Sequence, residues 1–284
     1  MALQAKVNPP TSTEILPSGI EVAYWDSIGP DGEPQERRYE VNGQRYPSIS
    51  TIAGIYHKEA LVPAAVKMQE EAIIRLSEHS DYDCGLPKQR QLRKALIKNG
   101  LHYDCIWEEA RDRGSVVHDA MQGMAEAGSS AFVVSKVGDA FQHALAGSKF
   151  WIDHKPEPID TEYMVASVRH GFVGRGDLFC KLKGGRKARV DYKTVSKWSY
   201  VWDEKRRRPT NKLRPPHDEN LIALAGYELG AVESGYEPSE VQLIVRLGPD
   251  GNYDIYESPA GPEVFLASLA AYNARKELHE AMAA

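Results

Sequence analysis

The chain has 284 residues, of which 42% are hydrophobic and 26% charged, and its formal net charge is −5. This is the composition of an ordinary globular protein, and a chain of this length can bury a full core without disulfides or a structural metal. The acidic balance excludes a molecule that is basic all over, so any surface that binds nucleic acid has to be local.

Cysteine spacing and hydropathy exclude further classes. Cys84, Cys105 and Cys180 have no C-x-x-C spacing, so they predict no disulfide framework, zinc site or iron–sulfur cluster. No apolar run reaches the ~18 residues of a membrane span, and the first residues lack the apolar segment of a signal peptide. We therefore expect a cytoplasmic protein with no membrane partner.

The first half of the chain predicts a short hairpin followed by helices. Residues 1–20 contain three prolines among small polar residues and predict a flexible arm. Strand character over 20–25 and 38–41 flanks the turn sequence GPDGEP, which predicts a hairpin. In PSIST, Ser48 or Ser50 is a candidate helix N-cap. Helical patterns follow at 59–78, 88–99, 103–127 and 137–152.

From Pro156 the pattern changes to strands. Alternating or β-branched residues predict strands at 162–168, 174–182, 188–194, 241–247 and 253–257, and helical patterns cover 219–234 and 263–283. This order predicts one α+β domain over 21–284, with a hairpin and helical part at 21–155 and a sheet with closing helices at 156–284.

The segment GRGDLFCKLKGGRKARVDYKT carries the strongest chemical signal. Asp191 and Lys193 are two residues apart on an expected strand, so their side chains share one face. Gly184 and Gly185 form an expected turn at the midpoint between Asp177 and Asp191. A hairpin folded there places the two aspartates on adjacent strands, within about one residue of being opposite.

Two facing carboxylates beside a lysine are unfavourable as a purely structural arrangement, because like charges repel across a strand pair. A divalent cation that binds both removes the repulsion, and Mg²⁺ typically takes one or two carboxylates. Such a cation lowers the pKa of a water molecule, which the lysine can position. The alternative is a surface Asp–Lys pair on an edge strand.

A basic stretch follows this pattern. From Arg186 to Arg214 there are eleven Lys or Arg and three acids, or about +8. Focused positive charge attracts phosphates, and the alternating aromatics of KWSYVW can stack on unpaired bases. The alternatives are a solvated basic loop and a strand with one buried aromatic face. We predict DNA contacts from Arg113, Lys197, Trp198, Arg206, Arg207, Arg208, Lys212 and Arg214.

The order of the motifs resembles the PD-(D/E)XK nuclease superfamily. GRGD followed by DYK is similar to its second and third motifs, with aspartate where glutamate is frequent. RGSVVH resembles the G-x-x-x-H helix motif of RecB-like and phage-type exonucleases, in which Gly114 would let the helix approach the sheet near His118. ALAGYELGA resembles the Q-x-x-x-Y helix motif, with Tyr227 matching and Ala223 at the glutamine position. The resemblance covers about residues 39–260.

The resemblance implies a central mixed sheet flanked by helices and a Mg²⁺- or Mn²⁺-dependent deoxyribonuclease that hydrolyses phosphodiester bonds. It implies metal ligands at His118, Asp177, Asp191 and the carbonyl of Tyr192. It implies catalytic roles for Asp177, Asp191, Lys193, Tyr227 and Glu162. RecB-like CRISPR-associated relatives carry four cysteines for an iron–sulfur cluster; this chain has nothing comparable, so no cluster is expected.

Family analogy further suggests a phage-type role in DNA recombination, replication or repair, in the host cytoplasm if the chain is phage-encoded. The expected partner is DNA, linear double-stranded or single-stranded, with a single-strand annealing protein and a homo-oligomer as further expectations. An exonuclease is favoured. Two alternatives stay open: a catalytically inactive DNA-binding module, which Ala223 motivates, and a structure-specific endonuclease.

Overall fold

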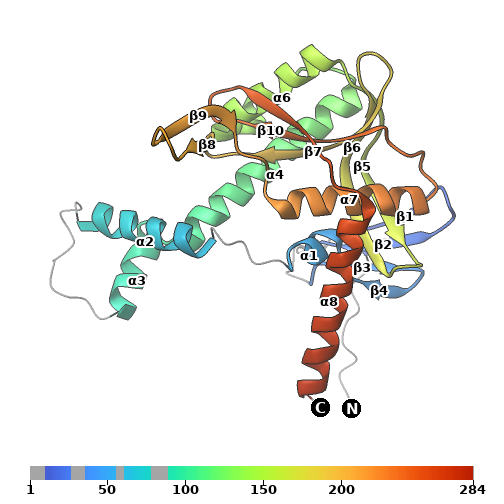
Figure 1. Cartoon of the computed structure of the whole chain (residues 1–284), viewed down its shortest axis with the longest axis horizontal. Coiled ribbons are helices and arrows are strands. Elements are labelled where there is room, and N and C mark those ends of the chain that lie inside the picture. Colours follow the sequence, from blue (N-terminus) through green and yellow to red (C-terminus); the bar gives the residue numbers. More distant parts are fainter. Residues whose placement is uncertain (1–9, 27–35, 56–60, 78–88, 284) are drawn as a thin grey trace.

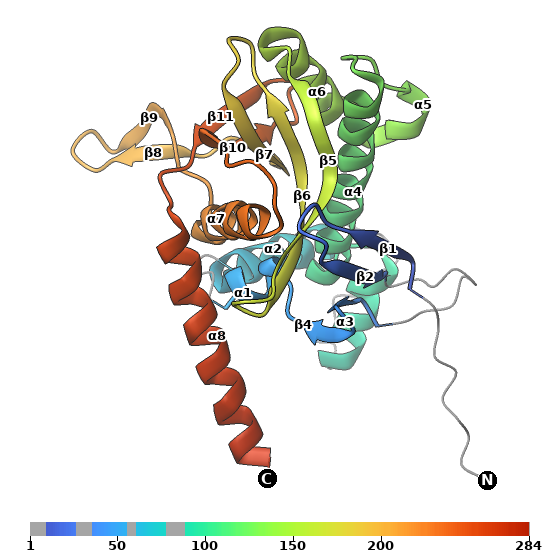
Figure 2. The same cartoon turned by 90° about the vertical axis from the view of Figure 1, so that its right-hand side faces the viewer.

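A computed structural model describes residues 10–26, 36–55, 61–77 and 89–283. Its centre is a five-stranded mixed sheet with the strand order β11–β10–β7–β6–β5. Helices cover both faces of this sheet, α4 and α6 on one side and α7 on the other (Figures 1 and 2). A mixed sheet with flanking helices agrees with the expected α+β class.

The sheet combines a meander with a crossover. Strands β5 (Glu157–Ser167), β6 (Phe172–Lys181) and β7 (Lys187–Thr194) are antiparallel neighbours. β10 (Val241–Leu247) returns parallel to β7 and forms a hairpin with β11 (Tyr253–Glu257). A parallel return needs a long connection, usually a helix, and α7 lies in that connection.

Two apolar clusters hold the helices to the sheet. The first lies under α4 (Tyr103–Ala127) and α6 (Phe141–His154) and includes buried side chains of β6, β7 and β10. The second lies under α7 (Asp218–Glu233), α1 (Ile49–Ala53) and the first turns of α8 (Pro262–Ala283). The second half of α8 extends away from the body (Figures 1 and 2).

The helical region before α4 is a separate small pair. α2 (Leu61–Ser77) packs on α3 (Gln89–Lys98) through buried Ala72, Leu76 and Leu96. The helix expected at 137–152 is instead the short α5 (Val134–Val137), a 3-10 turn at Gly138–Ala140 and then α6. Gly138 has φ 46°, a conformation that suits glycine and separates the two helices.

The N-terminal sheet corrects the expectation of a flexible arm over 1–20. Residues 1–9 lie outside the described part, but β1 (Ser12–Ile15) pairs antiparallel with β2 (Glu21–Trp25). Leu16, which is 2% exposed, anchors this hairpin in an apolar cluster that includes side chains of β5 and β6. β3 (Arg38–Val41) and β4 (Gln44–Tyr46) complete the sheet. The N-terminal sheet therefore packs directly on the central one.

The basic stretch after β7 forms an additional hairpin; a strand over KWSYVW was one of the alternatives left open, but its pairing partner was not predicted. β8 (Tyr200–Asp203) and β9 (Arg208–Leu213) pair only with each other. Elsewhere, Ser48 is confirmed as the N-cap of α1, because its side chain accepts a hydrogen bond from the N–H of Thr51. Within the described ranges, every helix is too short or too polar to cross a bilayer.

Candidate active site

Asp177 and Asp191 occupy neighbouring positions on β6 and β7. The antiparallel register pairs Leu178 with Val190, so the next pair of facing positions, here called a rung of the sheet, brings Asp177 opposite Asp191. The ladder ends at that point, and the N–H of Tyr192 donates to Oδ2 of Asp177 at 2.7 Å. The hairpin expected from the sequence is confirmed, and the two strands begin to separate where the carboxylates lie.

Glu162 extends this rung onto β5. β5 and β6 keep one register on both sides of Glu162, which places it across from Asp177. Glu162 has φ 49°, in the left-handed region that costs a non-glycine residue about 1–3 kcal/mol. Its Oε2 lies 2.9 Å from Nε of Arg175, which compensates one negative charge. Three acidic residues on three adjacent strands thus share one level of the sheet.

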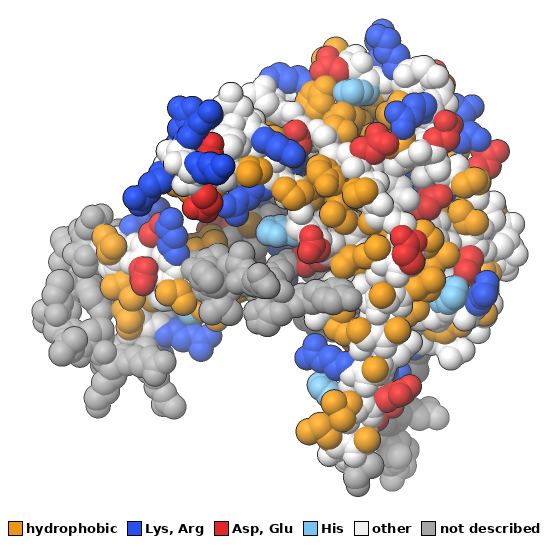
Figure 3. Space-filling model, in the orientation of Figure 1, with side chains coloured by type: hydrophobic (Ala, Val, Ile, Leu, Met, Phe, Trp, Pro, Cys, Tyr) orange, Lys and Arg blue, Asp and Glu red, His pale blue; other side chains and the backbone are white. Residues whose placement is uncertain are grey.

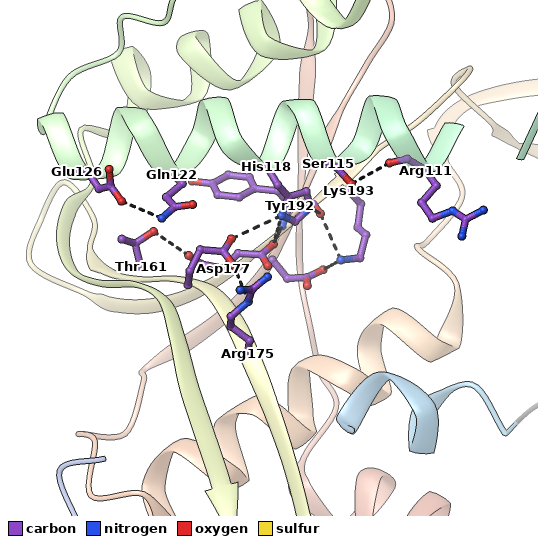
Figure 4. A network of polar contacts seen from close by, with 12 residues as sticks. Arg111, Ser115, His118, Gln122, Glu126, Thr161, Arg175, Asp177, Tyr192 and Lys193 are labelled. Carbon is purple, nitrogen blue, oxygen red and sulfur yellow. Dashed lines mark hydrogen bonds and ion pairs between the residues drawn. The ribbon is translucent and has the colours of Figure 1, made fainter. Parts of the chain in front are cut away.

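His118 reaches this rung from α4 (Figure 4). Its Nδ1 lies 3.6 Å from Oδ2 of Asp177 and 4.0 Å from Oε1 of Glu162, while Nε2 lies 3.1 Å from the carbonyl oxygen of Tyr192. His118, Glu162 and Asp177 each offer a ligand atom, and these atoms lie within 4.8 Å of one another. The three side chains therefore have the spacing to hold a metal ion.

The electrostatics of His118 show that the rung attracts positive charge. The Asp177 carboxylate raises the pKa of His118 to about 9; burial opposes this effect and Glu162 adds to it. Because a carbonyl can only accept, Nε2 carries the hydrogen that faces Tyr192, and Nδ1 is the atom turned toward the carboxylates. The carboxylates therefore favour a proton at Nδ1, and the same position has the spacing for a cation in its place.

Asp191 and Lys193 form a buried pair beside the group of three. Asp191 is 4% exposed. Nζ of Lys193 lies 2.6 Å from its Oδ2, which is the distance of an ion pair, although the angles do not meet those of a hydrogen bond. Burial raises the pKa of Asp191 although Lys193 opposes it. Burial lowers the pKa of Lys193, but Asp191 and Asp177 outweigh it and leave that pKa above its usual value. Both side chains share one face of β7, as expected.

The carbonyl of Tyr192 is occupied by two donors in this arrangement. Besides His118, Nζ of Lys193 donates to it at 3.3 Å. A carbonyl oxygen has two lone pairs, so a metal would have to replace one of these donors. Ligation by Tyr192 stays a prediction, and the same holds for Asp191, which lies outside the group of three.

A cleft of about 750 Å³ opens over these residues. Its walls come from the N-terminal sheet, α1, α4, the central strands and α7. Sequence reasoning did not assign several polar side chains that line it: Tyr24, Asp26, Arg37, Tyr39, Ser48, Ser50, Arg111, Ser115 and Arg175. Of these, Arg175 stands inside the GRGD motif and next to Asp177 in space (Figure 4), so the motif itself was the signal.

Tyr227 lines the same cleft from α7, as expected. Burial raises its pKa well above the usual value, so its hydroxyl stays protonated and can donate a hydrogen bond. Ala223, one turn earlier, packs on the apolar cluster that contains Ile49 and Phe265 and is not among the residues that line the cleft. The position of the family glutamine therefore contributes packing here.

On α4, the DNA contact expected from Arg113 stays a prediction, and the close approach expected at Gly114 needs correction. Arg113 does not line the cleft, whereas Arg111 does, and the Nε of Arg113 is buried. Arg111 lies seven residues before His118, about two helical turns, so both side chains are on the same face of α4. Arg113 lies five residues before His118, which rotates its side chain by about 140° from that face. Gly114 is not required for a close approach, because an added Cβ would lie 3.8 Å from Oγ1 of Thr194, an ordinary contact.

The glycines that matter for close packing are in GRGD itself. A Cβ on Gly176 would lie 2.4 Å from the ring of Tyr163. A Cβ on Gly174 would lie 2.6 Å from Ile49 and 2.9 Å from Tyr227. The two glycines leave room for neighbouring side chains, while Arg175 and Asp177, which alternate with them along β6, carry charge. The motif therefore combines close packing with two charged side chains that line the cleft.

The predicted DNA contacts after β7 lie outside the cleft. Lys197, Arg206, Arg207, Arg208, Lys212 and Arg214 are exposed residues in and around the β8–β9 hairpin. The ring of Trp198 lies against Gly248, so closely that an added Cβ there would be 2.3 Å from it. The indole also donates a hydrogen bond to Asp250, so this ring is not free to stack on a base. This ring packs on the turn between β10 and β11.

Comparisons with known proteins add little to this geometry. No protein-family model matches the chain, and no curated protein matches it. Among solved structures, the one titled "Crystal structure of SSO0001" is 14% identical. The match covers 74% of this chain and 84% of that one, with a TM-score of 0.31.

Proposed function

We propose that this protein is a metal-dependent deoxyribonuclease with a core of the PD-(D/E)XK type, acting on DNA ends as an exonuclease. The observation that carries the proposal is the convergence of His118, Glu162 and Asp177, whose ligand atoms lie within 4.8 Å, beside the buried Asp191–Lys193 pair. The groups come from a helix and three adjacent strands and meet in one open cleft.

The donor set fits a hard divalent cation. Carboxylate oxygens suit Mg²⁺ and Mn²⁺, and one imidazole nitrogen is compatible with Mn²⁺. His118 Nδ1, Glu162 and Asp177 would hold the ion, with Asp191 adjacent. When bound, the cation would supply Lewis-acid activation of a water molecule and of the phosphodiester.

The side chains around the ion have separate roles in this proposal. Lys193 is held by Asp191 with its ammonium group in the cleft, where it orients the attacking water and stabilises charge on the phosphate. Tyr227 remains a hydrogen-bond donor to substrate because burial keeps it protonated. Arg111 lines the cleft and supplies positive charge for a phosphate, and Arg175 adds to it while paired with Glu162.

The test is digestion of end-labelled linear DNA and closed circular DNA with Mg²⁺, Mn²⁺ or EDTA. Wild type should degrade the linear substrate alone and only with metal, and Lys193→Ala should not. Lys183→Ala, an exposed lysine of the β6–β7 turn, is the matched control and should cleave like wild type. Cutting of the circle would change the assignment to a structure-specific endonuclease.

A second candidate is an inactive DNA-binding module, and the packing of Ala223 on the apolar cluster favours it. This reading expects salt-sensitive DNA binding with no cleavage under any metal. The buried Asp191–Lys193 pair favours the enzyme, since a binding module has no need of an arrangement that is costly to bury. A phage-type role, a single-strand annealing partner and a homo-oligomer remain predictions.

A further inference from the structure

The β8–β9 hairpin, with its flanks from Lys197 to Arg214, is an arm with a fixed base. The N–H of Val195 donates to the carbonyl of Leu247 at 3.0 Å, just before the arm begins. At the arm's base the N–H of Arg214 donates to the carbonyl of Ser199 at 2.8 Å. The rest of the arm projects beyond the central sheet, as both views show (Figures 1 and 2). Its position is therefore set by β7 and β10, while its tip is open to solvent.

Two aromatic side chains on this arm are exposed. Tyr200 is 43% and Trp202 is 44% exposed, and burial alternates along β8 so that both lie on its outer face. Across the ranges that the structure describes, all other Phe, Trp and Tyr side chains are buried or half-buried. Core packing thus accounts for the aromatic residues elsewhere but gives no reason for these two.

The arm is also strongly basic. Residues 197–214 contain seven Lys or Arg and two acids, a net +5 on a chain of net −5. In the described part, Arg206 is the one cation of the tip with an acidic partner, Asp203 at 3.8 Å. Lys and Arg side chains gather over this hairpin in the space-filling view (Figure 3). The charge is available for an anionic polymer.

We infer that the arm binds unpaired nucleotides of single-stranded DNA, with Tyr200 and Trp202 stacking on bases and the basic tip contacting phosphates. This rests on the proposed function, which makes DNA the substrate. Residues two apart on a strand are separated by about 6.6 Å. That is about twice the 3.4 Å spacing of stacked bases. One base therefore fits between the two rings, or each ring can cover one base.

Unpaired DNA fits these features better than a duplex does. In a duplex the faces of the bases are covered by their neighbours, so a protein ring finds no base to stack on unless the base is displaced. Arginines alone would suffice for a duplex, because phosphate contacts position DNA without reading it. The pairing of exposed rings with a basic tip is the combination found where proteins hold single strands.

The test measures binding in EDTA, by fluorescence anisotropy of an oligothymidine of about twelve nucleotides and of a blunt duplex of equal length. Tyr200→Ala/Trp202→Ala should weaken single-strand binding about tenfold or more and leave duplex binding unchanged. Tyr200→Phe/Trp202→Phe should retain single-strand binding, because both rings remain. Ile152→Ala, which removes an exposed apolar side chain on α6, is the control and should change neither affinity.

Equal loss on both substrates, or no loss on the single strand, would overturn the inference. Near-wild-type circular dichroism of the double alanine variant excludes misfolding, which is not expected for exposed residues. The binding assay involves neither metal nor cleavage, so its result does not depend on the result of the nuclease test. If the wild type binds single strands through these rings but cleaves nothing, the proposed nuclease activity is wrong and the inference about the arm stands.

Discussion

Nε2 of His118 lies 3.1 Å from the carbonyl oxygen of Tyr192, although 74 residues separate the two in the chain. This contact joins α4 to β7 and fixes the imidazole so that Nδ1 faces Asp177 and Glu162. A histidine that binds a metal commonly donates its other ring N–H to a carbonyl or carboxylate, which sets its orientation. His118 has this arrangement, with one ring nitrogen at a carbonyl and the other facing two carboxylates.

The stability of the metal-free protein should depend on pH through His118. Its pKa is about 9 when folded and 6.5 in the unfolded reference, so protonated His118 stabilises the fold. The contribution is complete below about 6.5 and is lost as pH rises through about 9. Urea unfolding in EDTA should show wild type losing its advantage over His118→Gln across this window. An advantage that grows with pH would contradict the assignment.

Metal binding should compete with that proton. Below about 9 a cation has to displace the proton from Nδ1, so the affinity for Mn²⁺ should rise with pH and level off above it. Calorimetry in buffers of different ionisation enthalpy should detect release of about one proton per ion. His118→Gln should bind more weakly and release no proton. Unchanged proton release in that variant would remove His118 from the site.

Asp177 has a structural and a chemical role that two substitutions separate. Asp177→Ala leaves the N–H of Tyr192 without its acceptor, which should cost about 1–3 kcal/mol of unfolding free energy. Asp177→Asn keeps an acceptor and should cost less. Losing a group that merely supports a metal ligand costs about 10–100-fold, so both variants should lose more than this in cleavage rate. Urea unfolding and end-labelled DNA digestion measure the two effects.

Removing only the lysine of the Asp191–Lys193 pair should cost more stability than removing both charges. Lys193→Met leaves a buried carboxylate whose pKa burial already raises, and should cost up to about 3 kcal/mol of stability. Asp191→Asn/Lys193→Met removes both charges and should recover most of that loss, but no cleavage. A double variant as unstable as the single one would mean that the two side chains act independently.

Glycine substitutions test which close contacts the fold requires. Gly176→Ala places a methyl group 2.4 Å from the ring of Tyr163 and should cost about 1–3 kcal/mol. Gly114→Ala meets Thr194 at 3.8 Å within a helix and should stabilise by about 0.5–1 kcal/mol. Thermal unfolding of both variants is the measurement. A destabilising Gly114→Ala would restore the close approach that the resemblance implied.

The sequence predicted features that depend on local alternation or on a turn. The Gly184–Gly185 turn and the two-residue spacing of Asp191 and Lys193 determine the β6–β7 register, so the facing aspartates were accessible without a structure. The ends of α4 and of the β10–β11 hairpin follow in the same way from periodicity and turn residues. These features are set by residues close together in the chain.

Features that depend on tertiary placement were missed or wrong. The left-handed conformation of Glu162 has no sequence signature, because glutamate seldom adopts it and nothing in the local pattern marks this position. Arg111 was missed, since only the packing of α4 shows which of its residues face the cleft. β1 and the β8–β9 hairpin lie in stretches rich in proline or charge, whose composition is typical of loops. These strands form because each pairs with a neighbouring strand, β1 with β2 and β8 with β9, which composition alone does not show.

The level of the sheet shared by Glu162, Asp177 and Asp191 has a consequence for biosynthesis. No segment of the chain carries the three residues with metal-binding spacing by itself: β5, β6 and α4 contribute one each, and β7 holds the histidine in place. A nascent or partly unfolded chain therefore lacks the group altogether. If the protein cuts DNA, a cell that makes it is not exposed to cleavage by incomplete chains, and damage to the fold silences the activity.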